Sequence, residues 1–339
     1  MIKVVIATCN RPEMLRTALQ SVADQTICSR IGSVVVSENG GKRESASVCA
    51  EFPSLPINYF FRDPPVSPLE HGRILFSEAT TEKYTAILHD DDWWAPRHLE
   101  NAFNALESNP HCAATFSNFF ETPGPEYPGE ITHKAWKVWM AAGCKLDRPQ
   151  VELNIEQVLA ASLLQASFHY SSSFGRSRAV NDSMLRIINT NNPFDNDRIY
   201  PVFLAENGPI IYFPEPSAHI RMHSLQDSMR EVYQNRDSIL KAQTTLWMQN
   251  QWPNQCKDAA RCFNANNAAI NNATRQKVLL HVHDPLKSTL IEKLNFDLPQ
   301  EIKVIQPAKH QRNIRWFVRQ FFPYGAVMAL RHVFKWIKG

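Results

Sequence analysis

The sequence predicts an α/β fold built on a mostly parallel sheet. Short runs rich in β-branched or aromatic residues occur at 3–7, 31–36 and 57–61, and such runs are typical of buried strands. Apolar residues at helical spacing lie between the first two runs, and polar residues directly follow each of these two runs. Alternating strands and helices favour a parallel sheet with right-handed crossovers, whose ligand-binding groups collect at the carboxyl ends of the strands.

The first helix is predicted to begin at Pro12, directly after the strand Lys3–Ala7 and the turn Thr8–Arg11. Proline is favoured at the first helical position, and Glu13 places a negative charge in the first turn. The apolar residues that would form its buried face are Met14, Leu15, Ala18, Leu19 and Val22.

The next elements are predicted from similar signals. The run Ile31–Val36 is followed by the polar and glycine residues Ser37–Gly41, and a third strand is expected at Ile57–Phe61. The proline-rich stretch 62–73 is expected to be an ordered loop that leads into a helix at 74–79, before a fourth, buried strand over Tyr84–Leu88.

Bulk composition indicates a globular protein. The chain has 339 residues, 44% of them hydrophobic, and no apolar run of about 18 residues that would span a membrane. No signal peptide is expected, because the apolar stretch 4–7 is short and ends at Thr8. Seven cysteines without a CxxC pair indicate reduced thiols and a cytoplasmic protein.

An acidic run follows the fourth strand. His89 is followed by Asp90, Asp91 and Asp92, and then by two tryptophans. If the segment stays extended, Asp90 and Asp92 point to the same side and can bind one cation, for which Mg²⁺ or Mn²⁺ is suited. The alternative is a solvated acidic turn.

Four motifs in this order resemble family 2 glycosyltransferases, which use nucleotide sugars and have the GT-A fold. Val4–Arg11 is similar to the family's first strand and its turn, and Val34–Gly40 to the second strand with its acidic turn. Ile87–Asp92 resembles the metal-binding DXD segment, and Asn192–Arg198 resembles the F-x-E-D segment. Glu38 stands where aspartate is more usual in the family, Asn196 where glutamate is, and His71 where asparagine is.

The resemblance implies a domain organisation. Residues 1–225 would form the GT-A catalytic domain, a Rossmann-like sheet flanked by helices, with a nucleotide-sugar half at about 1–120 and an acceptor half at about 121–225. Residues 226–339 would form a mainly helical C-terminal extension.

The resemblance also implies the donor site. In the proline-rich stretch 62–73, Arg62 and Arg73 are both candidates for a phosphate contact. Each could equally be an ordinary surface arginine. Arg221 would bind the diphosphate. The full set expected to bind the nucleotide sugar is Thr8, Asn10, Arg11, Glu38, Asn39, Arg73, Asp90, Asp91 and Arg221.

The metal and the catalytic base are likewise expected from the family pattern. Asp92 would be the principal ligand of Mn²⁺ or Mg²⁺, joined by Asp90 and by His223 of the motif Arg221-x-His223, unless that histidine is structural. Asp197 would be the base, with Asp195 as the alternative. Either aspartate could instead cap the helix expected at 199–206.

The acceptor side is less defined. The serine-rich stretch 167–176 is interpreted as a strand lined with hydroxyls, which suits either sugar binding or an edge strand. The segment 121–166 contains Trp136 and Trp139, which would either stack on a sugar or lipid or fill core space.

Charge is concentrated at the carboxyl terminus. Eight of the 36 Lys and Arg residues lie in 302–339, and none of the 33 Asp and Glu residues do. Basic and aromatic residues at helical spacing over about 312–338 predict amphipathic helices on an anionic membrane surface. An oligomer contact is the competing interpretation. No nucleic-acid-binding motif accompanies the basic residues, so no nucleic-acid partner is expected.

The resemblance, together with these patterns, implies an inverting, metal-dependent glycosyltransferase. It would move a sugar, with UDP as the expected carrier, to a glycan or lipid-linked glycan of a bacterial surface polysaccharide, at the inner face of the cell membrane. The alternatives are a nucleotidyltransferase that makes nucleotide sugars, or a non-catalytic glycan-binding scaffold. A nucleotidyltransferase normally has a glycine-rich phosphate loop, and no such loop follows the strand predicted at 3–7.

Overall fold

The computed structural model describes most of the first 223 residues. The described residues are 1–77, 81–125, 130–131, 144, 146–164, 168–189 and 196–223, together with individual positions between 244 and 258. All of them lie within one compact unit, Met1–Asn295.

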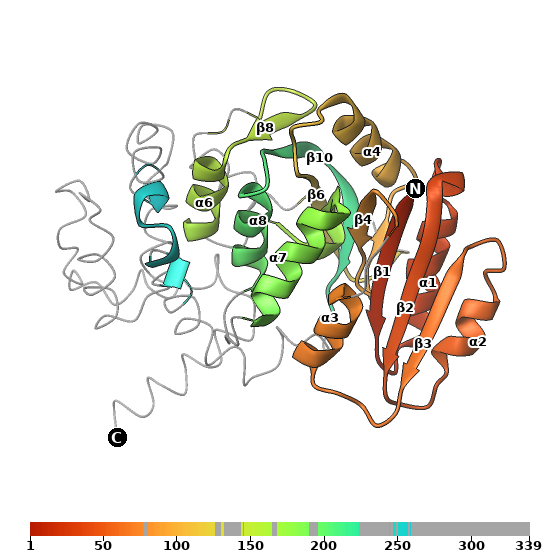
Figure 1. The fold of residues 1–339 in the computed structure, drawn as a ribbon. Coiled ribbons are helices and arrows are strands. Elements are labelled where there is room, and N and C mark those ends of the chain that lie inside the picture. Colours follow the sequence, from red (N-terminus) through yellow and green to blue (C-terminus); the bar gives the residue numbers. More distant parts are fainter. Residues whose placement is uncertain are drawn as a thin grey trace, which may run out of the picture. The chain divides into compact units, whose positions relative to one another are not determined.

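A mixed sheet in the order β3-β2-β1-β4-β9-β6-β10-β5 forms the centre of this unit (Figure 1). The strands β1, β2, β3, β4, β6 and β10 all run in the same direction, whereas β9 lies antiparallel between β4 and β6. The short strand β7 pairs with β6, and β8 pairs with β10. The strand bounds are β1 Ile2–Thr8, β2 Ile31–Asn39, β3 Ile57–Arg62, β4 Tyr84–Ile87, β5 Trp93–Trp94, β6 Ala114–Thr122, β7 Glu130–Ile131, β8 Val151–Leu153, β9 Ser173–Arg176 and β10 Ile210–Arg221.

Helices cover both faces of the sheet. Residues of α1, α2 and α4 share one hydrophobic cluster with β1 and β2. On the other face α7 contacts β4, β9, α3 and α8, and α8 also contacts α6. The helix bounds are α1 Pro12–Ala23, α2 Ser45–Ala50, α3 Pro68–Ser77, α4 His98–Ser108, α6 Ile155–Leu164, α7 Ser177–Asn189 and α8 Asn196–Ala205, with short 3-10 turns η1 Cys28–Arg30 and η2 Tyr170–Ser172.

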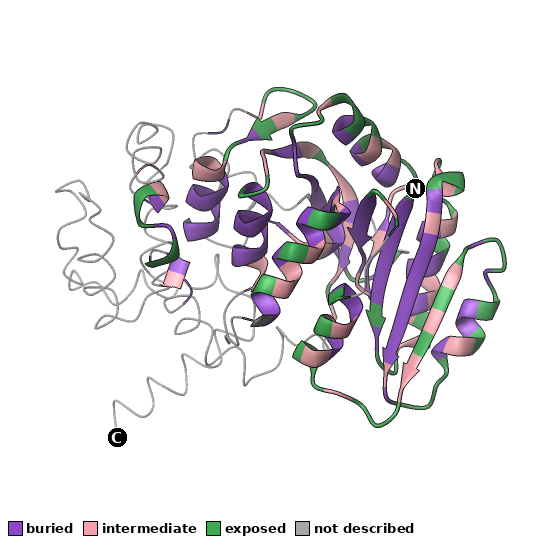
Figure 2. Ribbon diagram, viewed as in Figure 1, coloured by how far each residue is buried: buried purple, intermediate pink, exposed green. Residues whose placement is uncertain are grey.

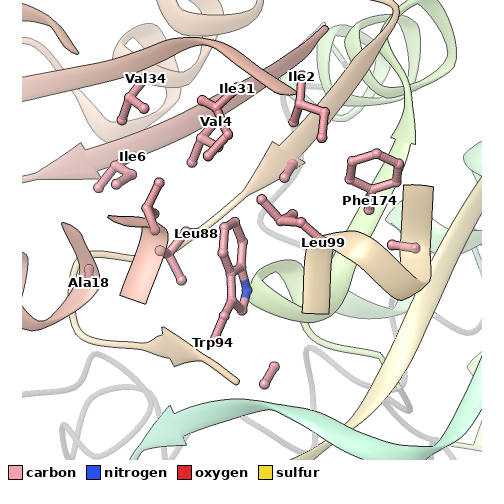
Figure 3. Packing of buried hydrophobic residues seen from close by; sticks show 14 of the residues in the cluster. Ile2, Val4, Ile6, Ala18, Ile31, Val34, Leu88, Trp94, Leu99 and Phe174 are labelled. Atoms are coloured by element: carbon pink, nitrogen blue, oxygen red, sulfur yellow. The ribbon is translucent and has the colours of Figure 1, made fainter. Parts of the chain in front are cut away.

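The alternation of side chains in β1 separates two cores. Ile2, Val4 and Ile6 are fully buried in the cluster with α1 and α4, while Val5 is buried on the opposite face. Figure 3 shows this cluster, with Leu88 and Trp94 packed beside β1. In Figure 2 β1 and β2 are almost entirely buried, whereas β3 at the sheet edge is half-buried and exposed. The strands β1 and β2 are therefore enclosed on both faces, and so is β4, which precedes the acidic run.

The predicted α/β class is confirmed, and two local predictions are corrected. The helix predicted at 74–79 begins at Pro68, because the Ser67 hydroxyl accepts the Glu70 N–H at 3.2 Å and proline suits the first turn. Only Ser173–Arg176 of the stretch 167–176 is a strand. Arg221 of the motif Arg221-x-His223 is the last residue of β10.

The serine hydroxyls explain the second of these corrections. Ser172 Oγ donates to the carbonyl of His169 at 2.8 Å, and Ser173 Oγ donates to the carbonyl of Tyr170 at 2.6 Å. Such local bonds compete with strand pairing and favour a turn, which here is η2.

Several predicted features lie outside the described residues. These are Asp195, Trp136, Trp139, most of the helices expected after residue 225, and the basic tail 312–338. Within the part that is described, none of the helices has the length and apolar character needed to cross a membrane.

Two buried histidines predict a loss of stability in mild acid. His98 stacks on Trp94 at 4.9 Å and shares a 2.7 Å hydrogen bond with Ser217, and His71 bonds Ser37 at 2.8 Å. Burial lowers the pKa of His98 to about 3 and that of His71 to about 4. Below about pH 6.5 the unfolded chain binds protons that the folded chain cannot bind.

Urea unfolding is therefore expected to show a smaller free energy of unfolding at pH 5 than at pH 7.5, by about 2 kcal/mol for each buried histidine. His98→Gln should reduce this pH dependence, and the exposed His111→Gln should leave it unchanged. An equal pH dependence in all three proteins would contradict the assignment.

Candidate active site

The candidate site lies where parallel strands end together. Because β1, β2, β4 and β10 run in the same direction, their carboxyl ends meet at one edge of the sheet. Thr8 ends β1 and pairs in register with Glu38 of β2, while the acidic run follows β4 and Arg221 ends β10. The predicted donor residues from four separate strands are thus collected at one edge.

The acidic run forms a turn rather than an extension of β4. The strand ends at Ile87, and the Asp92 N–H donates to the carbonyl of His89 at 3.2 Å. In a turn the alternation of side chains no longer applies, so Asp90 and Asp92 need not share one side. The two carboxylates have different protein partners.

Asp90 is bound to the end of β1. Its Oδ2 accepts the Thr8 hydroxyl at 2.8 Å, and its Oδ1 accepts Arg11 Nη1 at 3.1 Å. Arg11 also reaches Asp91 Oδ2 at 3.0 Å. Burial raises the pKa of the Asp90 carboxyl, and the Arg11 charge opposes that rise. Both oxygens of Asp90 are thus bound by the protein.

Asp92 is the most buried carboxylate of the run, at 1% exposure. Its Oδ1 accepts the backbone N–H of Arg221 at 2.9 Å, and its Oδ2 accepts the Ser171 hydroxyl at 2.5 Å. Burial raises the pKa of Asp92 to about 7. A carboxylate at this depth is stabilised in its charged form by a cation.

Asp91 is linked to the end of β10. His223 Nε2 lies 3.0 Å from Asp91 Oδ2, and Arg221 Nε donates to the Asp91 carbonyl at 2.9 Å. The Arg221 guanidinium also lies 5.2 Å from the centre of the Trp93 ring. The predicted residues His223 and Arg221 therefore reach the acidic turn, but His223 contacts Asp91 rather than Asp92.

Two other imidazoles lie beside Asp92. His169 Nδ1 is 3.6 Å and His89 Nδ1 is 3.8 Å from Asp92 Oδ2. Among the described residues, these two histidines and Asp92 have donor atoms within 4.8 Å of one another, which is close enough for a shared metal ion. The set expected from the sequence, Asp92 with Asp90 and His223, is not gathered in this way. Burial lowers the pKa of His169 to about 4, so its ring is neutral at pH 7.

The end of β2 offers a buried acceptor atom. Glu38 is fully buried, and its Oε2 accepts the Tyr59 hydroxyl at 2.6 Å. Its Oε1 is also buried and accepts no hydrogen bond from any described residue. Beyond the strand ends, Gly41 has a φ of 95°, which favours glycine, and a Cβ there would also come within 2.0 Å of the Asn10 side-chain oxygen.

Two residues expected at the donor site have structural partners. Asn39 accepts the Val66 N–H at 2.9 Å and donates to the Val66 carbonyl at 2.8 Å, so its amide anchors the loop before α3. Arg73 forms an exposed ion pair with Glu70, one turn earlier on α3. The structure gives neither side chain a hydrogen bond or ion pair to the acidic turn.

Asp197 lies in the first turn of α8 and is half-buried. Tyr200 is three residues further and therefore on the same helix face. Its ring packs 4.8 Å from that of Tyr170, which lies 5.8 Å from His89. This ring series links the face of α8 that contains Asp197 to the acidic turn. The place of Asp197 in the first turn of α8 is also compatible with an interaction between its carboxylate and the amino terminus of this helix.

The sequence interpretation missed His89, His169 and Ser171. His89 directly precedes the acidic run, which was the available signal. His169 and Ser171 were expected on a strand, whereas η2 brings them to Asp92 because β9 runs antiparallel to β4.

This arrangement is of the GT-A type, in which a largely parallel α/β sheet presents an acidic turn at its carboxyl edge. Residues 3–157 match the family described as glycosyl transferase family 2. This part of the chain belongs to that family and is a glycosyltransferase domain. None of the curated proteins compared with the chain matches it.

Solved structures support the same fold. The structure of S. aureus TarS residues 1–349 in complex with UDP-GlcNAc aligns with a TM-score of 0.52 at 12% identity, covering 87% of this chain and 88% of that one. S. aureus TarS in a longer form aligns with a TM-score of 0.50 at 12% identity over 87% of this chain, which spans only 53% of that longer protein. At this level of identity the likeness concerns the fold.

Proposed function

We propose that the protein transfers a sugar from a nucleoside diphosphate, with UDP as the nucleotide, to a hydroxyl of a glycan or lipid-linked glycan, with inversion at the sugar. The observation on which this rests is the acidic turn Asp90–Asp92, held at the strand edge by Thr8, Arg11 and Ser171. The relation to TarS, which has been crystallised with UDP-GlcNAc, supports a UDP-linked donor.

The nucleoside would lie over the ends of β1 and β2. Glu38 Oε1 is a buried acceptor without a partner among the described residues, and such an atom is costly unless a donor reaches it. Uracil has one ring N–H that can donate to this oxygen. Asn10, on the adjoining turn, would contact the nucleoside. Asp90 would orient the ribose, and the positive charge of Arg11 would balance the negative charge of Asp90.

The diphosphate would lie near Asp92, the proposed principal ligand of a divalent cation. When bound, Mn²⁺ or Mg²⁺ neutralises the charge that develops on the departing diphosphate. Arg221 is fixed by Asp91 and Trp93, and its guanidinium would add a second positive charge at the same edge.

The acceptor hydroxyl needs a base, and Asp197 is proposed for that role. The rings of Tyr200 and Tyr170 connect its helix face to the acidic turn. A carboxylate in this position would take the acceptor proton as the bond to the sugar forms.

Nucleotide binding provides the test of this function. Because selective binding to the native state stabilises it, UDP with Mn²⁺ should raise the melting temperature, corresponding to about 2.7 kcal/mol at a concentration of 100 times Kd. ADP and CDP with Mn²⁺ should raise it less. Equal shifts with all three nucleotides, or none, would contradict a UDP-sugar donor site.

The purified protein can also be tested for the two alternative functions. A nucleotidyltransferase would release pyrophosphate from UTP and a sugar phosphate, and a scaffold would bind glycans without releasing UDP from any UDP-sugar. The proposed enzyme should release UDP and form no pyrophosphate.

The tail is proposed to hold the enzyme on the inner membrane face, close to a lipid-linked acceptor. Residues 312–339 lie outside the described part of the chain, so this proposal rests on the basic and aromatic pattern of the sequence. Deleting them should release the protein from anionic vesicles in a flotation assay while UDP binding is retained.

High salt should weaken vesicle binding of the intact chain, since the attraction is partly electrostatic. Vesicles of zwitterionic lipid are the control. If the intact chain does not bind anionic vesicles at low salt, the tail has another role, such as an oligomer contact.

A further inference from the structure

We infer that His89, Asp92 and His169 together bind the divalent cation, and that the site therefore prefers a transition metal over Mg²⁺. This inference deepens the proposed function, since it concerns the cation of the same donor site. It differs from the set expected from the sequence, in which Asp90 and His223 join Asp92.

The spacing of the three donor groups fits a coordination shell. The two Nδ1 atoms lie 3.6 and 3.8 Å from Asp92 Oδ2, too far for a good hydrogen bond. Ligands at about 2.1 Å from a tetrahedral metal are about 3.4 Å from each other, which is close to these separations. All three donor atoms lie within 4.8 Å of one another.

Ser171 positions all three groups. Its hydroxyl oxygen accepts the backbone N–H of His89 at 3.0 Å and donates to Asp92 Oδ2 at 2.5 Å. Its own backbone N–H donates to His169 Nδ1 at 3.2 Å, which holds the ring beside Asp92, and a metal bound at Nδ1 would replace this long hydrogen bond. Trp94 in turn donates to the Ser171 carbonyl at 2.5 Å and is itself buried. One residue anchored in the core thus fixes the ligands from the turn after β4 and from η2.

The competing ligands are less suited to a cation. Asp90 is paired with the Arg11 guanidinium, whose positive charge opposes a cation there, whereas the groups bound to Asp92 are a neutral hydroxyl and a backbone N–H. His223 is bonded to Asp91 at 3.0 Å.

The chemistry of the donors determines the preferred metal. Mg²⁺ favours an all-oxygen shell and binds through one or two carboxylates, whereas imidazole nitrogen suits Zn²⁺, Co²⁺ and, less strongly, Mn²⁺. Two imidazoles and one carboxylate should therefore bind Co²⁺ more tightly than Mn²⁺, and Mn²⁺ more tightly than Mg²⁺.

The test uses the full-length protein with Co²⁺, Mn²⁺ or Mg²⁺ added separately, without nucleotide or sugar, so that its outcome is independent of the transfer activity. Titration calorimetry should give the affinity order stated above. Pulsed EPR of the bound Mn²⁺ should detect nitrogen couplings of two imidazoles.

His89→Gln and His169→Gln should each remove one nitrogen coupling and weaken Mn²⁺ binding by about 10-fold or more, since changing even a residue that only supports a metal ligand typically costs that much. His223→Gln is the matched control, because it changes a histidine at the same turn that the inference excludes from the metal. It should keep both couplings. The inference is overturned if His223→Gln removes a coupling, if the other two variants keep both, or if Mn²⁺ alone does not bind. A normal UDP-dependent melting shift with any of these results would leave the proposed function intact.

Discussion

Replacing Asp92 by asparagine is expected to lower sugar transfer by about 10³-fold or more, because the principal ligand of the cation loses its charge. The change is nearly isosteric. The amide oxygen can still accept the Arg221 N–H that Oδ1 accepts in the native protein, so the fold should persist. The measurements are the rate of UDP release with acceptor present and the binding of UDP with and without Mn²⁺. The Mn²⁺-dependent part of UDP binding should be lost.

Asp182→Asn is the matched control for this variant. Asp182 lies on α7 in an exposed pair with Arg178 at 3.8 Å, so its loss should change neither transfer nor binding. Circular dichroism of both variants should match the native spectrum. Full transfer activity in Asp92→Asn would show that the acidic turn does not hold the catalytic cation.

Replacing Asp197 by asparagine is expected to lower the turnover rate by about 10² to 10⁴-fold, because removing a general base costs stabilisation of the transition state. Donor binding should be almost unchanged, since the base contacts the acceptor hydroxyl rather than the nucleotide. Turnover and UDP affinity must therefore be measured on the same preparation.

A purely structural role of Asp197 predicts a different result. As a residue of the first turn of α8, it would contribute about 1 kcal/mol to stability through the helix terminus, and its replacement would lower the melting temperature rather than turnover. Asp195→Asn is the second variant. If that change has the large effect on turnover and Asp197→Asn does not, the base is Asp195.

The strands that form the site could be predicted from the sequence because their signals are local. The β-branched runs of β1 and β2 are continuous, as expected for strands buried on both faces, and the polar residues after them mark the strand ends. The approximate place of Thr8, Glu38 and Asp90 followed from the same rule, since parallel strands share one carboxyl edge.

The ligand set around Asp92 could not be predicted in this way. The sequence does not show that β4 ends at Ile87, two residues before His89, and an acidic turn and an extended acidic segment have the same composition. The contact of His169 with Asp92 depends on β9 running antiparallel between β4 and β6, and pairing between strands distant in sequence has no local signal.

Asn39 and Arg73 show a related difficulty. Both residue types suit a nucleotide site, yet Asn39 binds the backbone of Val66 and Arg73 pairs with Glu70. The Glu70 partner is three residues away on α3, and a helix that begins at residue 74, as the sequence predicts, does not contain this pair.

Crystals of the full-length protein grown with UDP and Mn²⁺ provide the most direct measurement, through the anomalous scattering of the metal. We expect one strong peak within coordination distance of the Asp92 carboxylate, with the UDP diphosphate beside it and the uracil against Glu38. A peak remote from Asp92, or UDP bound away from the ends of β1 and β2, would contradict the proposed donor site.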